Sequence, residues 1–230
     1  MNPLRPHAQF ELGLVVVCAG GMMDGYAFTA HDQVFATGQT GNVVRLALAT
    51  SLLDSYSFLR YFIPIVSFVM GIILSRLVSS RCFHGRQDQM QSWVIDFEAI
   101  TFAVIGIFSD YIPDFLSDCL IASCAAMSFE NFRELGQGSR YSSTYCTGNL
   151  RSFSEALYEG TFGHDPSELR RALHYLALIG SFFIGVVIFV GTNDVVIERS
   201  AFDDGLLISV TFLLARLFVD GWLSGGLASE

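Results

Sequence analysis

The sequence predicts an all-α, polytopic membrane protein with about six transmembrane helices arranged as two inverted three-helix repeats. Two observations predict the membrane class: 52% of the 230 residues are hydrophobic, and only 15% are charged, whereas a soluble domain has about 25% charged residues. A third observation, a short polar motif that recurs in each half of the chain, predicts the repeats. We expect one transmembrane domain over residues 1–230, with repeat one at about 10–112 and repeat two at about 115–225.

Six apolar runs are candidates for membrane-spanning helices, which need roughly 17 to 25 mostly apolar residues. The runs are Gly13–Ala30, Tyr61–Val78, Ala99–Phe108 (which extends at both ends), Phe115–Phe129, Ala172–Val190 and Leu206–Leu223. The alternative, a soluble helical bundle, would carry a charged face on each helix with a period of 3.6 residues. The fifth run, Ala172–Val190, has no such face, so the membrane class is favoured.

The positions of the basic residues predict how the chain is oriented. All thirteen Lys or Arg residues are arginines. Most of them come before span one, after spans two and four, or before span five, whereas acidic residues dominate the links between spans three and four and between spans five and six. The positive-inside rule then places both termini in the cytoplasm. Arg45 and Arg60, in the link between spans one and two, are exceptions.

The net charge and the cysteine pattern exclude several kinds of partner and cofactor. The net charge is -9 and no basic stripe is present, so a nucleic acid is not expected as a partner. The five cysteines form no C-x-x-C pair and no zinc spacing, and most of them lie in apolar runs, which argues against a metal site or a disulfide scaffold. We expect no cofactor and no metal. The expected partners are the lipid bilayer and a small solute, and a homo-oligomer stays open.

A polar, glycine-rich motif occurs once in each half of the chain. The first signature, Phe35–Val44, reads FATGQTGNVV, and the second signature, Ser143–Leu150, reads STYCTGNL. Short helix-forming stretches follow them, at Val43–Leu53 and Leu150–Glu159. The eleven residues of the first stretch would cover roughly 16 Å, about half of a bilayer core. Each stretch is then an interfacial helix or the outgoing half of a re-entrant loop, with Asn42 suited to cap the first one.

The two halves of the chain match when one is shifted along the other. A shift of 107 residues pairs Asp24 with Asn131, and it pairs Thr37, Thr40, Gly41, Asn42 and Ala49 with Thr144, Thr147, Gly148, Asn149 and Ala156. A shift of 114 pairs Tyr61, Ser67, Phe68 and Gly71 with Tyr175, Ser181, Phe182 and Gly185. Because each half has three spans, the second half is predicted to be inverted relative to the first. In transporters with inverted repeats, paired interrupted helices mark the binding site.

The two signatures are therefore predicted to be the two halves of one site. If both short helices leave the membrane, their free N–H groups and positive dipole ends converge at the midplane, an environment that suits an anion or a polar solute. The substrate-binding residues that we expect are Asp24, Thr37, Thr40, Gly41, Asn42, Asn131, Thr144, Thr147, Gly148 and Asn149.

Charged residues inside or beside the spans are the strongest individual candidates. Asp24 interrupts span one, and a charge there costs at least roughly 2.5 to 3.5 kcal/mol, so such groups usually serve function. The alternative for Asp24 is a structural role, with donors from another helix holding its carboxylate. Glu130 and Arg133, three residues apart, can pair on one helix face, and Arg216 and Asp220, four apart in span six, can neutralise each other. Each of these two pairs is either structural or part of a gate.

The motifs together resemble the YoaK family of bacterial integral membrane proteins. They are G-G-x-x-D-G at Gly20–Gly25, F-x-T-G-Q-T-G-N at Phe35–Asn42, E-N-x-R at Glu130–Arg133 and T-Y-C-T-G-N-L at Thr144–Leu150. The resemblance covers most of the chain and implies an inner-membrane protein of about six helices, but it supplies no substrate. The family typically has Gln-Asn where this chain has Glu130 and Asn131.

The leading functional hypothesis is a small secondary transporter or exporter of a polar or anionic solute. Coupling to protons stays open, because a buried Asp24 can carry a proton. The alternatives are a channel of the same architecture and a non-transporting membrane scaffold or sensor subunit. An enzyme is not expected, since the sequence shows no nucleophile–base pair and no metal constellation.

Overall fold

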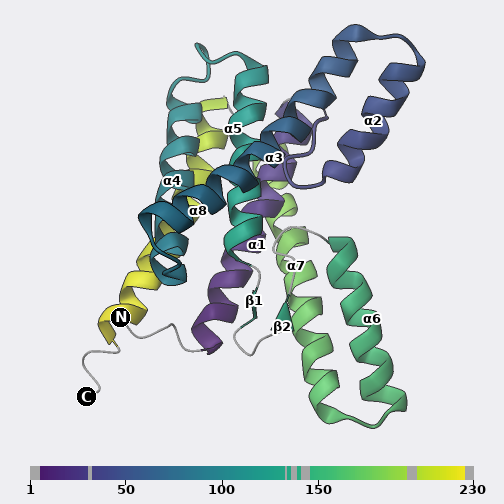
Figure 1. Cartoon of the computed structure of the whole chain (residues 1–230), viewed down its shortest axis with the longest axis vertical. Coiled ribbons are helices and arrows are strands. Elements are labelled where there is room, and N and C mark those ends of the chain that lie inside the picture. The colour runs from purple at the N-terminus through teal and green to yellow at the C-terminus, as the bar shows by residue number, and fades with distance from the viewer. Residues whose placement is uncertain are drawn as a thin grey trace.

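A computed structural model describes the backbone of residues 6–30, 33–132, 134–135, 139–140, 146–195 and 201–225. Within these ranges the fold consists of helices joined by short links, with one pair of two-residue antiparallel strands (Figure 1). The elements are α1 (Pro6–Ala30), α2 (Gln39–Ser51), α3 (Ser55–Cys82), α4 (Gln87–Ile107), α5 (Asp114–Asn131), β1 (Glu134–Leu135), β2 (Ser139–Arg140), α6 (Cys146–Phe162), α7 (Pro166–Val195) and α8 (Ala201–Gly225).

The all-helical prediction is confirmed, but the number of membrane spans is confirmed only in part. Five of the six apolar runs form the main part of a long helix, namely α1, α3, α5, α7 and α8, and the run Ala99–Phe108 forms the last part of α4, which ends at Ile107. In the described part of the chain, four helices are long and apolar enough to cross a membrane: α1, α3, α4 and α7. The helix α5 is only 18 residues long and three of these residues are acidic, Asp114, Asp118 and Glu130, whereas each of the four contains an 18-residue apolar stretch with no more than two charged residues.

The long helices pack in a bundle in which α1 is central and α3 and α7 lie at the periphery. The main contacts join α1 to α7, α3 to α5 and α4 to α8, and each short helix packs on the long helix that follows it. In α1, 72% of the apolar segment is buried, whereas only 22% is buried in α3 and α7. Met70 of α3 and Phe183 of α7 are among the large apolar side chains left exposed. Apolar helices with exposed outer faces indicate a membrane protein.

Small residues allow the close approach of the peripheral helices to their partners. A Cβ on Gly71 of α3 would lie 2.8 Å from the backbone oxygen of Ser123 on α5. A Cβ on Gly185 of α7 would overlap the backbone oxygen of Cys18 on α1. Ser123 and Ser181 add hydrogen bonds across the same two helix pairs, to backbone oxygens of α3 and α1 respectively. These two glycines therefore pack helices within this chain.

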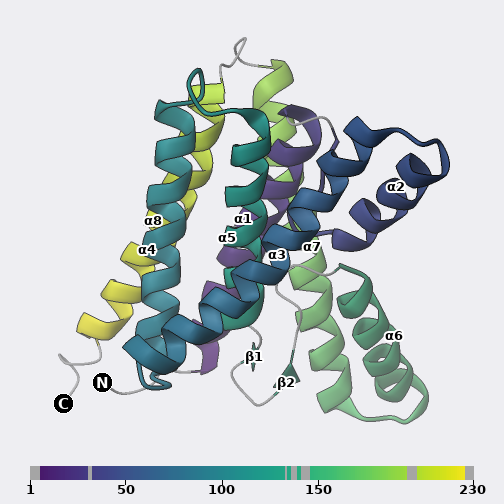
Figure 2. The ribbon, with the colours of Figure 1, turned by 45° about the horizontal axis from the view of Figure 1, so that its top comes forward.

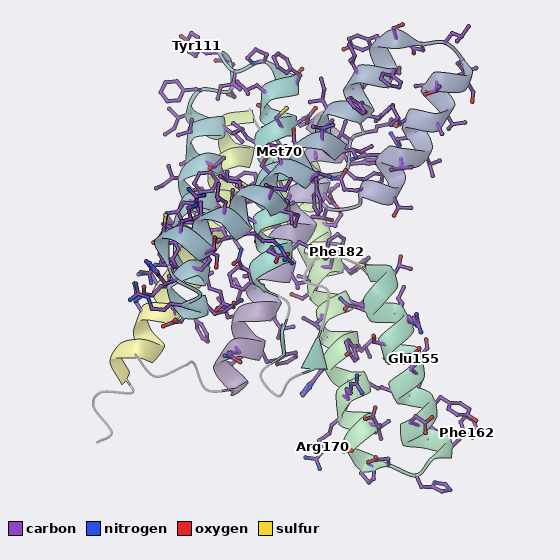
Figure 3. The ribbon with its side chains drawn as sticks, in the orientation of Figure 1. Met70, Tyr111, Glu155, Phe162, Arg170 and Phe182 are labelled. Atoms are coloured by element: carbon purple, nitrogen blue, oxygen red, sulfur yellow. The ribbon has the colours of Figure 1, made fainter. Side chains whose placement is uncertain are left out.

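The two short helices begin near each other and run in opposite directions. Figures 1 and 2 show α2 and the start of α3 as one projecting hairpin, and α6 and the start of α7 as another, with the inner ends of α2 and α6 adjacent at mid-length of the molecule. The outer surface of α2 is apolar, with Val44, Leu48 and Leu52 exposed. In contrast, α6 exposes an ion pair between Arg151 and Glu155. Figure 3 places Glu155 and Phe162 along the outer half of this second hairpin.

Both short helices begin earlier than the sequence predicted. The expected stretches were Val43–Leu53 and Leu150–Glu159, whereas α2 begins at Gln39 and α6 at Cys146. The residue that caps α2 is Gly38, not Asn42. The physical reason is that the Asn42 side chain bonds backwards to Phe35, which leaves it inside the helix and lets the first turn form before it.

Candidate functional site

The first signature folds into a loop that surrounds the carboxylate of Asp24 on α1. Asp24 is only 8% exposed, and it accepts hydrogen bonds from the backbone N–H of Thr37 (2.8 Å) and from the Thr37 hydroxyl (2.6 Å). The backbone N–H groups of Ala36 and Gly38 also act on it. A buried carboxylate is costly unless such donors replace water. This cluster therefore solvates the charge that interrupts the apolar sequence of α1.

Asn42 and Gln39 hold the loop in this shape. The Asn42 amide accepts a hydrogen bond from the Phe35 N–H (3.0 Å), and it donates to the Phe35 carbonyl (2.7 Å) and to the Gln39 side chain (3.0 Å). Gln39 donates to the Ala36 carbonyl at 2.9 Å. A Cβ on Gly41 would lie 2.6 Å from the Phe35 ring, so only glycine leaves room for that ring. These residues build the loop from within.

The second signature brings the start of α6 toward the same carboxylate. The Cys146 thiol lies within electrostatic range of Asp24. Burial follows the same order in both short helices: Asn42 and Asn149 are buried, while their neighbours Thr40 and Thr147 are exposed. Gly148 is exposed as well. The predicted counterpart of Thr37, Thr144, lies outside the described residues.

Asn131 and Glu130 lie in a second place, at the end of α5. Asn131, 4% exposed, donates to the Ser75 hydroxyl of α3 at 2.6 Å and to the Met127 carbonyl at 2.9 Å. Glu130 forms an ion pair with Arg76 of α3 at 2.9 Å. All four side chains of this contact between α3 and α5 line an open cavity of about 940 Å³. The predicted partner of Glu130, Arg133, lies outside the described residues.

Arg216 and Asp220 lie in a third place, where α8 meets α4. The two side chains form an ion pair, as their i, i+4 spacing predicts. Arg216 also binds Asp96 of α4, with Nε to Oδ1 at 3.0 Å, a partner that the sequence did not predict. The three residues line a cavity of about 320 Å³ together with apolar side chains that include Trp93. Arg216 thus joins α8 to α4 through Asp96, and it pairs with Asp220 within α8.

One buried acid, Glu98, was missed by the sequence analysis. It lies at the centre of α4 with 0% exposure, and the Ser128 hydroxyl of α5 lies 2.8 and 3.0 Å from its two carboxyl oxygens. The sequence-based prediction placed the apolar run at Ala99–Phe108, with extension at both ends, and named no role for Glu98. Five apolar residues among the seven at 93–99 were the signal that could have placed it inside the span.

The predicted site residues are therefore distributed rather than gathered in one pocket. Asp24, Thr37, Gly41 and Asn42 form one cluster beside the first turn of α6, whereas Asn131 with Glu130, and Arg216 with Asp220, lie along other helix pairs. Among the described residues, no group of three or more His, Cys, Asp or Glu side chains is placed to hold a metal ion. The chemistry that these clusters support is polar binding and charge compensation.

Comparison with known proteins gives a family but no activity. The model of the family described as a protein of unknown function (DUF1275) matches residues 12–219. No curated protein and no solved structure matches the chain. The matched segment includes α2, α6 and every residue of the clusters described above except Asp220. The chain therefore belongs to the DUF1275 family of proteins of unknown function, which confirms the resemblance to the YoaK family.

Proposed function

We propose that the protein is a secondary transporter or exporter of a small polar or anionic solute in a bacterial inner membrane, with both termini in the cytoplasm. The observation that carries the proposal is the meeting of the first turns of α2 and α6 beside Asp24 (Figures 1 and 2). The helices run away from each other, so their positive dipole ends point to one region. An anionic or polar solute is stabilised in such a place.

The packing of the long helices supports an inverted repeat. The contact of α1 with α7 has its counterpart in that of α5 with α3, and the contact of α2 with α3 has its counterpart in that of α6 with α7. The equivalent glycines Gly71 and Gly185 lie in equivalent contacts. Two such halves around interrupted helices are a recurrent plan of secondary transporters.

The exposed residues Thr40 and Thr147 are the ones best suited to meet a solute. Thr37 and Asn42 are engaged in the loop around Asp24, whereas Thr40 and Thr147 sit in the first turns with exposed side chains. In this proposal Thr37, Gly41 and Asn42 shape the site, and the threonines of the first turns contact the solute together with N–H groups.

Accessibility of single cysteines tests this arrangement. Thr40→Cys and Thr147→Cys are made in a chain whose five native cysteines are replaced, and each is labelled in vesicles with a membrane-impermeant thiol reagent from either side. Leu52→Cys and Phe162→Cys, at the exposed outer ends of α2 and α6, are the matched controls. We expect the two controls to label rapidly from opposite sides, and the two site positions to label slowly, with rates that change when a transported solute is added.

The same set of variants also provides the outcome that would overturn the proposal. Free labelling of position 40 from one side and of position 147 from the other, unaffected by any solute, would make the two segments surface loops. Labelling of both controls from one side would refute the inverted repeat. Thr40→Val and Thr147→Val then separate a site from a packing role, because a site role predicts a folded protein that moves no solute, while a scaffold role predicts lost stability.

A further inference from the structure

Glu98 is a buried carboxyl group whose surroundings offer no positive charge. It is 0% exposed at the centre of α4, which packs against α5 and α8. From α5 it meets the Ser128 hydroxyl and the Cys124 thiol. From α8, Ser209 bonds to the backbone of α4 at Ala99 rather than to the acid. In the part of the chain that the structure describes, no arginine or histidine acts on Glu98.

The charged side chains nearest along α4 and α8 are already bound to one another. Arg216 of α8 binds Asp96 of α4 and Asp220 of its own helix, so its charge is compensated there. The Ser128 hydroxyl has one proton to donate, and it lies against both carboxyl oxygens of Glu98. Among the described residues, the donors that act on this carboxyl group are the Ser128 hydroxyl and the Ser128 backbone N–H, and neither carries a positive charge.

Asp24 has the opposite surroundings. It receives the hydroxyl and the N–H of Thr37 and the neighbouring N–H groups of the loop. Several donors aimed at one carboxylate stabilise its charged form, while burial without donors favours the neutral acid. Asp24 and Glu98 thus differ in the number of hydrogen-bond donors that surround their carboxyl groups.

We propose that Glu98 together with Ser128 forms an intramembrane proton-binding site, through which the protein couples solute movement to a proton gradient. This rests on the proposed transport function. When a proton binds, an O–H bond forms on the Glu98 carboxylate; when the proton leaves, that bond breaks and the charge returns. Asp24, the sequence-based candidate for carrying a proton, is instead the anchor of the first signature.

A polar route leads from the surface toward this site. The cavity of about 940 Å³ between α3, α4 and α5 is lined by Gln87 and reaches Asn131. Asn131 and Ser128 are three residues apart on α5, so they occupy the same face of the helix one turn apart. Ser128 in turn contacts Glu98. Asn131 thus lies between the cavity and Ser128, about one helical turn from the serine that contacts Glu98.

Infrared spectroscopy of the purified full-length chain in lipid vesicles tests the proposal directly. A protonated carboxyl group gives a C=O stretching band that an ionised carboxylate lacks. At neutral pH we expect such a band in the wild type, its loss in Glu98→Gln, and its retention in Asp24→Asn. Glu155→Gln, which removes an exposed carboxylate of α6, is the matched control and leaves the band unchanged.

Exchange of the bound proton is tested by transfer of the vesicles into D2O. The Glu98 band is expected to shift as the acid becomes deuterated, and to shift more slowly in Asn131→Leu, which blocks the polar route. A band that is unaffected by Glu98→Gln, or that is lost in Asp24→Asn instead, would overturn the assignment. A Glu98 band that never shifts in D2O would identify a purely structural acid and overturn the coupling role.

Two further controls keep the test decisive. If Glu98→Gln does not fold, Glu98→Asp retains an acid in the same place and must move the band rather than abolish it; an unmoved band would refute the assignment. Failure of the transport proposal appears separately, as solute-independent labelling of cysteines at positions 40 and 147 with the Glu98 band intact. Solute-dependent labelling with no Glu98 band would refute the proton site alone.

Discussion

Removal of the Thr37 hydroxyl should weaken the fold around Asp24 by an amount that the structure allows us to estimate. Thr37 is 0% exposed, and its hydroxyl donates to the Asp24 carboxylate at 2.6 Å. Thr37→Val keeps the shape and the backbone N–H but deletes this donor. A hydrogen bond to a charged group contributes roughly 1.5–3 kcal/mol. We therefore expect the free energy of unfolding to fall by about 2 kcal/mol, roughly 30-fold in the folded-to-unfolded ratio.

A double-mutant cycle attributes this loss to the pair. Asp24→Asn removes the charge but keeps an oxygen that can accept the Thr37 N–H, and the double variant Asp24→Asn with Thr37→Val lacks both the charge and the hydroxyl. Because the residue-37 N–H and the oxygen at position 24 remain in all four proteins, the cycle isolates the coupling between the Asp24 charge and the Thr37 hydroxyl. This coupling energy should be on the order of 1 to 3 kcal/mol, because the two groups are in direct contact. Unfolding by sodium dodecyl sulfate in mixed micelles, followed by circular dichroism and limited proteolysis, gives the four free energies of unfolding.

Thr50→Val is the matched control for this cycle. Thr50 is exposed on α2, and its hydroxyl bonds only to the Leu46 carbonyl of its own helix, at 2.8 Å. Its replacement should change the free energy of unfolding by no more than about 0.5 kcal/mol. If Thr37→Val costs no more than this control, or if the cycle is additive, then Asp24 does not depend on the loop. Its role as anchor of the first signature would then be wrong.

Two further predictions concern helix packing and pH. Gly185→Ala places a methyl group against the Cys18 carbonyl and should lower the free energy of unfolding by about 1–3 kcal/mol. In contrast, the methyl group of Gly180→Ala on the same helix enters open space and should raise the free energy of unfolding by up to about 1 kcal/mol. Equal midpoints of denaturation for the two variants would contradict this prediction. The hydrogen bond from the Ser57 side chain lowers the pKa of Asp54, the cap of α3. Its stabilising contribution is complete above the unfolded pKa, near 4, and is lost as pH falls through the lower folded value. The protection of the amides at the start of α3, measured against the exchange rate of an unstructured peptide at the same pH, should therefore fall in acid. In Asp54→Ala this protection should already be low at neutral pH.

The long helices could be predicted from composition alone, whereas the start of a short helix could not, because it depends on a local side-chain hydrogen bond. Apolar runs placed all the long helices because only a helix satisfies its backbone inside a membrane. The start of α2 was misplaced, since Asn42 is a good cap by residue type but its amide bonds to Phe35 instead. Such a choice depends on the path of the preceding loop, which periodicity does not encode.

Within the candidate site, Asp24 was predictable from the sequence, but the residues that contact it and the other charged groups were not. Asp24 stands out in an apolar run, and the structure finds it buried. Its contact with Thr37 depends on how the loop returns along α1. The ion pairs of Glu130 with Arg76 and of Arg216 with Asp96 join helices far apart in sequence, so spacing along one helix could not reveal them.

The charge states proposed for Asp24 and Glu98 predict one more difference, in the free energy of unfolding of two variants. If Glu98 is neutral, Ser128→Ala removes an uncharged hydrogen bond, which contributes roughly 0.5–1.5 kcal/mol. If Asp24 is ionised, Thr37→Val removes a charged one, and its cost should be clearly larger in the same unfolding assay. If Ser128→Ala lowers the free energy of unfolding by as much as Thr37→Val or more, then Glu98 is charged in the folded protein. The reason is that loss of a donor in the interior destabilises a protein by several kcal/mol only when the acceptor is charged. The smaller cost at Ser128 would mean that the contact between α4 and α5 can open with little loss of free energy, while the loop around Asp24 stays fixed.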